Sequence, residues 1–144
     1  MVAVSSCITG LKCRYNATDT YNSAVMSIVA DNYIAVCPEL LAGLGTPRSA
    51  CEIVGGDGAN VLNGTARIID EKGIDITEIM IEGAEKALQI CLKYKITKAY
   101  LQAKSPTCGC GKIYDGTFSK TLKFGDGILT ALLNQHGVEV VEVE

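Results

Sequence analysis

The sequence predicts an α/β fold, namely a three-layer Rossmann-like or flavodoxin-like sandwich with a mainly parallel sheet. Short β-branched runs alternate along the chain with segments whose apolar residues recur at three- and four-residue spacing. This alternation favours parallel strands joined by right-handed crossover helices. The chain has 144 residues, of which 48% are hydrophobic, enough for one core, so we expect a single α/β domain over residues 1–144.

The first half of the chain alternates two strands with two helices. β-branched runs predict the strands, an Asn or Ser suits the N-cap of a helix, and Pro38 suits a first helical turn. Glycine and proline predict a loop further on. The expected elements are, in order, a strand over residues 2–4, a helix over residues 25–30 capped by Asn22 or Ser23, a strand over residues 33–36, a helix over residues 39–44 and an extended loop over residues 45–58.

The second half continues the alternation. An acidic residue followed three positions later by glutamate predicts a capping box at residues 75–78, and apolar residues from Met80 to Leu92 share one helical face with Cys91. His136 precedes a glycine, as expected of a residue that caps a helix C-terminus. The expected elements are a strand over residues 66–69, a helix from residue 75, a strand over residues 99–103, a loop through residues 116–127 with a turn at Asp115 and Gly116, a helix over residues 126–135 and an edge strand over residues 138–143.

The charge of the chain disfavours two classes of partner. The net charge is -3 at pH 7, so no basic field attracts nucleic-acid phosphates or anionic lipid. No apolar segment is long enough to span a bilayer, and the N-terminus has no basic region of the kind found in secretory signals. We therefore expect a cytoplasmic protein with a small-molecule ligand, without nucleic-acid or membrane partners.

Three of the seven cysteines follow expected strands. Cys7, Cys37 and Cys108 each stand beyond a strand end and beside turn residues. The carboxyl ends of parallel strands meet at one edge of a sheet, so these thiols are expected to converge there. Thiolates are soft ligands for zinc or an iron–sulfur cluster, and three of them leave a coordination position open for substrate. The alternative is that these cysteines are small buried hydrophobic residues.

The other cysteines have weaker patterns. Cys13 and Cys110 are both alternatives for a fourth ligand, or else loop thiols without a role. Cys51 falls in the glycine-rich loop, and helical periodicity places Cys91 in the core.

Polar residues near the strand ends are candidates for binding and proton transfer. Glu39 follows Cys37 and Pro38, where a carboxylate either interacts with free N–H groups of a helix or serves as an acid or base. Ser105 is placed to hydrogen-bond a ligand or to form a turn. Arg48 is either a solvated loop residue or a group that orients a planar or anionic substrate.

The chain resembles the 2-thiouracil desulfurase family, formerly domain of unknown function 523, over essentially its whole length. The order and spacing of eight segments carry the resemblance, since any one of them alone is a weak signal. They are residues 4–10, 13–16, 36–39, 45–48, 52–53, 55–56, 104–109 and 113–118.

The resemblance implies a 4Fe-4S cluster held by only three cysteines, which would be Cys7, Cys37 and Cys108. The fourth iron would bind the sulfur of a thiolated pyrimidine such as 2-thiouracil and remove it without net redox chemistry, giving uracil and sulfide. Glu39 and Ser105 are the corresponding candidates for positioning substrate and moving protons, and we expect water to supply the new oxygen.

The chain departs from the family pattern at several positions. Asn16 stands where many members have aspartate after Arg-Tyr, and Cys51 and Cys110 are additional thiols. A fourth ligand or a thiol that accepts sulfur therefore remains an alternative. Two competing functions remain as well: a non-catalytic iron–sulfur or zinc-binding redox sensor or sulfur carrier, and a metal-free binding module with buried thiols.

Overall fold

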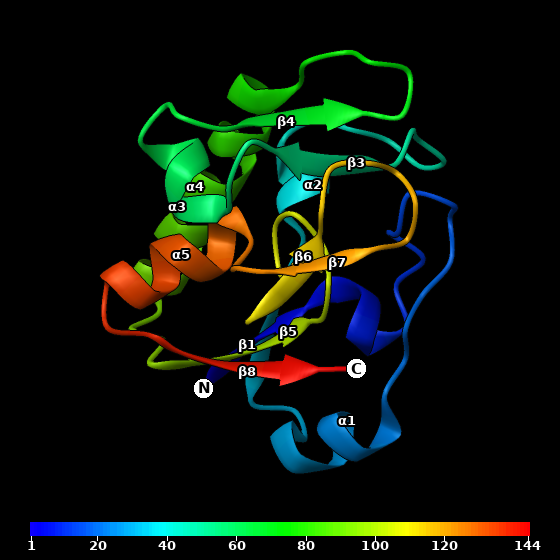
Figure 1. The fold of residues 1–144 in the computed structure, drawn as a ribbon. Coiled ribbons are helices and arrows are strands. Elements are labelled where there is room, and N and C mark those ends of the chain that lie inside the picture. The colour runs from blue at the N-terminus through cyan, green and yellow to red at the C-terminus, as the bar shows by residue number, and fades with distance from the viewer.

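A four-stranded parallel sheet lies at the centre of the computed structural model, which describes all residues 1–144 (Figure 1). The four strands are β1 (Val2–Ser5), β2 (Tyr33–Val36), β5 (Lys98–Gln102) and β8 (Glu139–Val143). Their spatial order is β2-β1-β5-β8, and all three pairings are parallel. Along the chain this order is second, first, third, fourth, as in flavodoxin-like folds. The predicted α/β class is confirmed, and the order is the flavodoxin-like one of the two alternatives.

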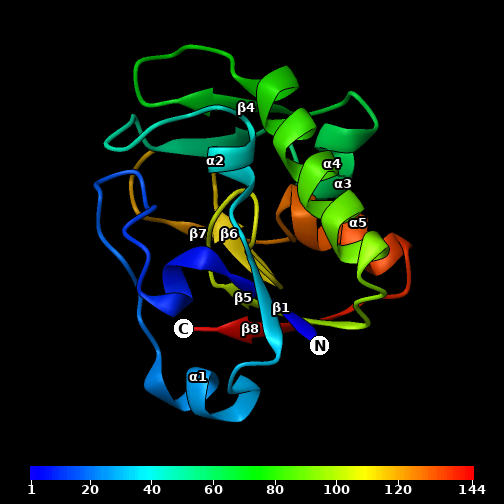
Figure 2. The same ribbon diagram turned by 180° about the vertical axis from the view of Figure 1, so that it is seen from behind.

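Helices cover both faces of the sheet, as Figures 1 and 2 show. α1 (Ser23–Val29) lies on one face, and α4 (Thr77–Lys93) and α5 (Ile128–Gln135) lie on the other. Successive residues of a strand point to opposite faces. Accordingly, Ala3 belongs to a core with residues of α4 and α5, whereas Val4 belongs to a second core with residues of α1. The three predicted layers are therefore present.

A hairpin-like pair of strands occupies part of the segment predicted to be an extended loop. β3 (Cys51–Val54) pairs antiparallel with β4 (Arg67–Asp70), and α3 (Gly58–Leu62) lies between them in the chain. The loop prediction for residues 45–58 is therefore wrong for Cys51–Val54, which form β3, and for Gly58, which begins α3, and it is confirmed for the residues between them. Glycines on both sides mask this four-residue strand in the sequence, and its pairing depends on β4. The predicted strand at residues 66–69 exists as β4, but it lies outside the parallel sheet.

One strand of a second antiparallel pair occupies part of the loop predicted over residues 116–127, and the rest of that loop is confirmed. The pair consists of β6 (Lys112–Tyr114) and β7 (Leu122–Phe124). The turn predicted at Asp115 and Gly116 is confirmed, since Asp115 Oδ1 accepts a hydrogen bond from the Thr117 amide at 3.0 Å and Gly116 has a φ of 94°. Strands of three residues are too short to show a period of two in the sequence.

Two of the predicted helix starts are confirmed. Asn22 caps α1 by accepting from the Val25 amide at 3.0 Å. Pro38 opens α2 (Pro38–Leu41), although this helix is shorter than predicted.

The capping box predicted at residues 75–78 is wrong. α4 begins at Thr77 without a side-chain cap at Ile76, and Asp75 instead pairs with Arg67 at 2.8 Å. Tertiary pairing with a neighbouring strand therefore engages the predicted capping carboxylate. A capping box does exist at α3, between Asp57 and Asn60.

The α4 face and the end of α5 largely agree with the sequence. Cys91 is fully buried in the core, as predicted, but Leu92 is 39% exposed and lies outside the buried face. His136 is the C-cap of α5, with Nδ1 2.9 Å from the Leu132 carbonyl oxygen, which confirms its capping role. None of the helices combines the length and apolar character needed to cross a bilayer.

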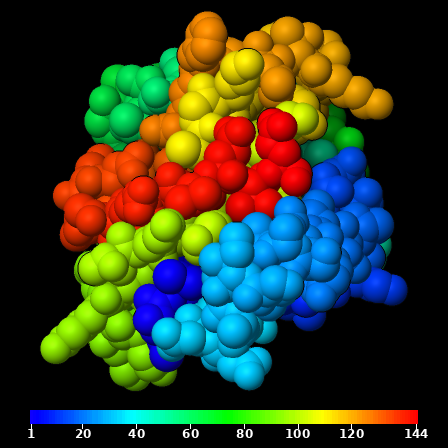
Figure 3. All heavy atoms as spheres, turned by 90° about the horizontal axis from the view of Figure 1, so that it is seen from below, coloured from blue at the N-terminus to red at the C-terminus, as the bar shows by residue number.

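The predicted edge strand is also present. β8 pairs only with β5, at the end of the sheet, and its two glutamates are exposed while its three valines are partly or fully buried. In the space-filling view from below, the red C-terminal strand runs across the surface beside the blue residues of the α1 region (Figure 3).

Candidate functional site

A cavity of about 490 Å³ lies at the carboxyl ends of the parallel strands. The chain runs from β1 outward to β2 and later returns to the other side of β1 as β5, so β1 is the strand where the winding reverses. Crevices at such points are the usual ligand sites of open α/β sheets. Five cysteines line this cavity, namely Cys7, Cys13, Cys37, Cys51 and Cys108.

The three cysteines predicted to converge come from three separate segments. Cys7 lies in a 3-10 helix (Ser6–Thr9) directly after β1, and Cys37 is the N-cap of α2 directly after β2. Cys108 lies on the loop that leads away from β5. Their exposed fractions are only 8%, 9% and 6%. The structure therefore brings these three thiols together as buried side chains at one cavity.

The start of α5 anchors the loop that carries Cys108. The amide of Ile128 donates to the Pro106 carbonyl at 2.8 Å, and the amide of Leu129 donates to the Thr107 carbonyl at 2.9 Å. The Thr130 hydroxyl adds a bond of 3.1 Å to the Cys108 carbonyl. Amides in the first turn of a helix have no partner within the helix. The loop supplies those partners, and α5 thereby fixes the place of Cys108.

Cys13 lies beside two of the three predicted ligands. Hydrogen bonding from its thiol lowers the pKa of Cys7 to about 7 and also lowers the pKa of Cys37. The pKa of Cys13 is raised because its thiol bonds to Cys37 and Cys7. Cys13 therefore keeps its proton while its two neighbours ionise more readily, and thiolates are the metal-binding form of cysteine.

The remaining cysteines have environments that favour the neutral thiol. Burial raises the pKa of Cys108 above its ordinary value and raises that of Cys51 to about 12. Such thiols lose their protons when a metal binds. Cys110 does not line the cavity, and desolvation raises its pKa.

Glu39 faces the cavity with both carboxylate oxygens engaged. Oε1 accepts from the Thr107 hydroxyl at 2.7 Å, and Oε2 lies 3.5 Å from Nη2 of Arg48. The Glu39 and Arg48 side chains are only 16% and 13% exposed. The carboxylate has no bond to a backbone amide of α2, so the capping alternative is not what the structure shows. Arg48, for its part, is an ion-pair partner rather than a solvated loop residue.

Ser105 combines its two predicted alternatives. Its Oγ accepts from the Cys108 amide at 2.7 Å, which closes a turn, and the side chain also lines the cavity. The hydroxyl lies 3.3 Å from the Thr107 hydroxyl. No local pattern singles out Thr107, because its contacts depend on how α2 packs against this loop.

Sequence reasoning also missed the wall formed by the second antiparallel pair. Tyr114 and Phe118 line the cavity from this side. Buried Glu52 holds the turn in place by accepting from the amides of Gly116 at 2.9 Å and Phe118 at 3.1 Å. Glu52 lies on β3, so the unrecognised strand hid its role.

The donor set fits a cluster better than a single ion. No group of three His, Cys, Asp or Glu side chains is arranged to hold a single metal ion. In an iron–sulfur cluster the cysteines bind different irons, so the ligands surround a wider body. A cavity walled by five thiols from separate segments has this character.

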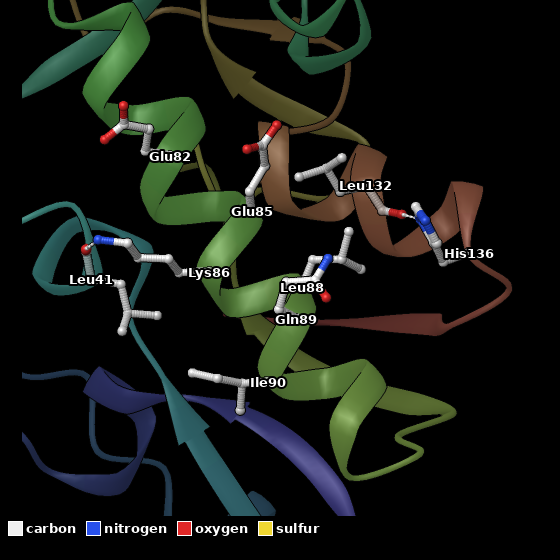
Figure 4. A pocket seen from close by; sticks show the side chains of 9 residues that line it. All are labelled: Leu41, Glu82, Glu85, Lys86, Leu88, Gln89, Ile90, Leu132 and His136. Atoms are coloured by element: carbon white, nitrogen blue, oxygen red, sulfur yellow. Dashed lines mark hydrogen bonds between the residues drawn. The ribbon is translucent and has the colours of Figure 1, made fainter.

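A second concavity lies on the outer side of α4 (Figure 4). It contains no cysteine, and the Lys86 ammonium at its edge donates to the Leu41 carbonyl at 3.3 Å. The predicted thiol chemistry therefore belongs to the first cavity. The residues that line the second are Leu41, Glu82, Glu85, Lys86, Leu88, Gln89, Ile90, Leu132 and His136.

The fold and the site together define a class: a small flavodoxin-like α/β protein with a cysteine-lined cavity at the carboxyl edge of its sheet. The sequence model of the 2-thiouracil desulfurase family matches residues 2–144, and the chain belongs to that family.

Two similar proteins extend this comparison. The uncharacterized protein YbbK of Bacillus subtilis (strain 168) is 43% identical over 142 residues, which covers 98% of this chain and 94% of YbbK. The solved structure of the [4Fe-4S]-dependent thiouracil desulfidase TudS (DUF523Vcz) has a TM-score of 0.84 and 35% identity, and the match covers 98% of this chain and 89% of TudS. The resemblance seen in the sequence is thereby confirmed.

Proposed function

We propose that this protein removes sulfur from a thiolated pyrimidine such as 2-thiouracil, giving uracil and sulfide, with a 4Fe-4S cluster as its cofactor. The observation that carries the proposal is the convergence of Cys7, Cys37 and Cys108, all three buried, on one cavity. Membership of the 2-thiouracil desulfurase family and the likeness to a [4Fe-4S]-dependent thiouracil desulfidase support it.

Cys7, Cys37 and Cys108 would hold the cluster. With three protein ligands, the bound cluster supplies an iron whose open position accepts a sulfur atom. Cys13 stays a protonated thiol beside Cys7 and Cys37 and stabilises their thiolates by hydrogen bonding. Cys51 lines the cavity as a thiol without a proposed ligand role.

Glu39 and Ser105 are the proposed polar groups of the reaction. The Glu39 carboxylate takes a proton from the water that supplies the new oxygen atom of uracil, and the Ser105 hydroxyl hydrogen-bonds the substrate. Both side chains line the cavity and both are held by other protein groups.

The setting we propose is one cytoplasmic domain over residues 1–144 acting on a small thiolated base. All seven cysteines are free thiols, as a reducing compartment maintains them. A cavity of about 490 Å³ is of the size that binds small molecules.

Anaerobic reconstitution with iron and sulfide tests the proposal. The loaded wild-type protein should show thiolate-to-iron absorbance, and Cys108→Ala should lose it, whereas Cys91→Ala should keep it because Cys91 lies in the core away from the cavity. Sulfide release on addition of 2-thiouracil should follow the same pattern. A chromophore without release from 2-thiouracil or another thiolated pyrimidine would favour a sensor or sulfur carrier instead.

A further inference from the structure

A threonine behind the cavity wall links the two polar residues proposed for the reaction. Thr107 is fully buried and does not line the cavity, whereas Glu39 and Ser105 both do. Its hydroxyl donates to Glu39 Oε1 at 2.7 Å and lies 3.3 Å from Ser105 Oγ. Thr107 therefore contacts both groups from behind the cavity wall.

The donors and acceptors of this network fix its direction. A hydroxyl has one proton to donate, and a bond to a carboxylate is stronger than one between neutral groups. The proton of Thr107 therefore points to Glu39, and its oxygen accepts from the Ser105 hydroxyl. Ser105 in turn accepts from the Cys108 amide at 2.7 Å. Both hydroxyls of this network, those of Ser105 and Thr107, therefore donate in the direction of Glu39.

The other side of the carboxylate is held independently. Arg48 lies 3.5 Å from Oε2, so the two oxygens of Glu39 have different partners. Without the Thr107 hydroxyl, Oε1 has no protein donor and the Ser105 hydroxyl is free to rotate. Arg48 alone does not restore either orientation.

We propose that Thr107 is a positioning residue for the desulfuration, which fixes the Glu39 carboxylate and the Ser105 hydroxyl relative to each other. The inference rests on the proposed function of this same site. The hydroxyl carries the effect, so serine should replace threonine and valine, which has the same shape, should not.

The experiment compares Thr107→Val and Thr107→Ser with a control, Thr77→Val. Thr77 is another buried threonine whose hydroxyl donates to a carboxylate, that of Asp75 at 2.6 Å, but it lies at the start of α4 outside the cavity. The measurements are kcat and KM for sulfide release from 2-thiouracil, the iron content after reconstitution, and the unfolding temperature of the protein without iron.

Thr107→Val should lower kcat about 100-fold, the scale of loss expected when a reacting group is misplaced. KM and iron content should stay within about 3-fold of wild type, because Thr107 faces neither the substrate nor the solvent. Thr107→Ser should keep kcat within about 3-fold of wild type. Thr77→Val should lower the unfolding temperature at least as much as Thr107→Val while leaving kcat unchanged.

A double variant, Thr107→Val with Glu39→Gln, tests whether Thr107 acts through Glu39. In the double variant, the valine should lower kcat by less than about 3-fold beyond the loss caused by Glu39→Gln alone, since the effects of residues that act as a unit are not additive. Fully multiplied losses would overturn the proposal.

Other results also decide it. Wild-type kcat in Thr107→Val overturns the inference and leaves the proposed function intact, whereas a loaded wild-type protein that releases no sulfide from any thiolated pyrimidine overturns both. If Thr107→Val fails to fold or to take up iron, Thr107→Ala removes the hydroxyl without the second methyl group. Loss of iron in the alanine variant as well, with Thr107→Ser loaded, overturns the proposal, because the hydroxyl then serves Cys108, whose Sγ lies 3.7 Å away.

Discussion

The two oxygens of Glu39 have different partners, the Thr107 hydroxyl and the Arg48 guanidinium, and this pairing defines the chemistry of the residue. A carboxylate held from both sides in a largely buried position has one orientation toward the cavity. This fixed orientation suits the proposed role of Glu39, which is to take a proton from water. An unpaired surface glutamate would have no such preference.

Glu39→Gln should lower kcat by about 100-fold or more, because general-base catalysis contributes about 10²–10⁴-fold. The amide keeps the size of the side chain, so the thiolate-to-iron absorbance should remain. Steady-state sulfide release checks this prediction. Glu82→Gln is the control, because Glu82 is exposed and lines the second concavity, on α4, rather than the cysteine-lined cavity. Wild-type turnover in Glu39→Gln would remove the base role from this residue.

Cys13→Ala should still take up iron and release sulfide. Its thiol lies beside Cys7 and Cys37 and hydrogen-bonds to both, but the proposed function assigns the three ligand positions to Cys7, Cys37 and Cys108. Iron content and absorbance, compared with Cys7→Ala, provide the measurement. If Cys13→Ala loses iron as fully as Cys7→Ala, then four cysteines hold the cluster and the open position is absent.

At the scale of residues, the sequence predicted well which side chains face the cavity. It did not predict the hydrogen-bond and ion-pair partners that hold those side chains in place. Cys7, Cys37 and Glu39 follow strand ends, and the geometry of a parallel sheet brings strand ends together whatever the loops do. Thr107 and Arg48 contact Glu39 across segments far apart in the chain. No local pattern encodes such contacts.

The helix α2 carries both Cys37 and Glu39, so its packing against α4 controls the site. Gly83 of α4 makes this packing possible, because a Cβ there would collide with the Pro38 carbonyl oxygen and lie 2.8 Å from the Ala42 side chain. The approach of the two helices therefore depends on a residue without a side chain.

Gly83→Ala should destabilise the protein by about 1–3 kcal/mol, the usual cost of overpacking, despite the better helix propensity of alanine. It should also lower iron uptake, because α2 must move away together with Cys37. Chemical unfolding and iron content test this, with Gly45→Ala as the control, since a Cβ at Gly45 meets nothing within 4 Å. Unchanged stability and iron content in Gly83→Ala would show that α2 adjusts without consequence.

The ion pair at the start of α4 should make the stability of the fold depend on pH. Hydrogen bonds from Arg67 and Thr77 hold the pKa of Asp75 well below its ordinary value. A depressed pKa in the folded state means that the contribution to stability is present above the ordinary pKa of about 3.9 and is lost as the pH falls below it. Because the group is exposed, we expect a small effect.

The unfolding temperature should therefore fall on acidification from about pH 5 to about pH 3, and Asp75→Asn should show a shallower fall over the same range. Thermal unfolding of both proteins without iron provides the measurement. Parallel curves for the two proteins would mean that Asp75 does not contribute to acid sensitivity.

Elements with a strong period of apolar residues were predicted well. Very short strands, which are defined mainly by their pairing with another strand, were not. The α4 core face and the strands of the parallel sheet have clear apolar patterns. β3 and β7 are four and three residues long and pair with strands elsewhere in the chain, so their sequences alone do not distinguish them from loops. The missed β3 also concealed the role of Glu52 in the cavity wall.

For the whole molecule, the order of the parallel strands explains where the site is. β1 lies between β2 and β5, and the segments after these three strands carry Cys7, Cys37 and Cys108. α5 then fixes the last of these segments through its first-turn amides. A cluster held by these three cysteines, as proposed, would tie together three segments from distant parts of the chain.

Binding of the cluster should therefore stabilise the fold. A group that binds the folded state and not the unfolded state raises stability, so the reconstituted protein should unfold at a higher temperature than the same protein without iron. Anaerobic thermal unfolding of both forms checks this, and Cys108→Ala should show no difference between them. Equal unfolding temperatures for the two wild-type forms would contradict a cluster held by three separate segments.

The most direct test of the account is the amount of sulfide released from 2-thiouracil by anaerobically reconstituted protein, measured together with the uracil formed. We expect catalytic release of sulfide and uracil in equal amounts, dependent on iron and lost in Cys7→Ala, Cys37→Ala and Cys108→Ala but not in Cys91→Ala. Sulfide release that persists without iron, or in any of the three cavity variants, would contradict it.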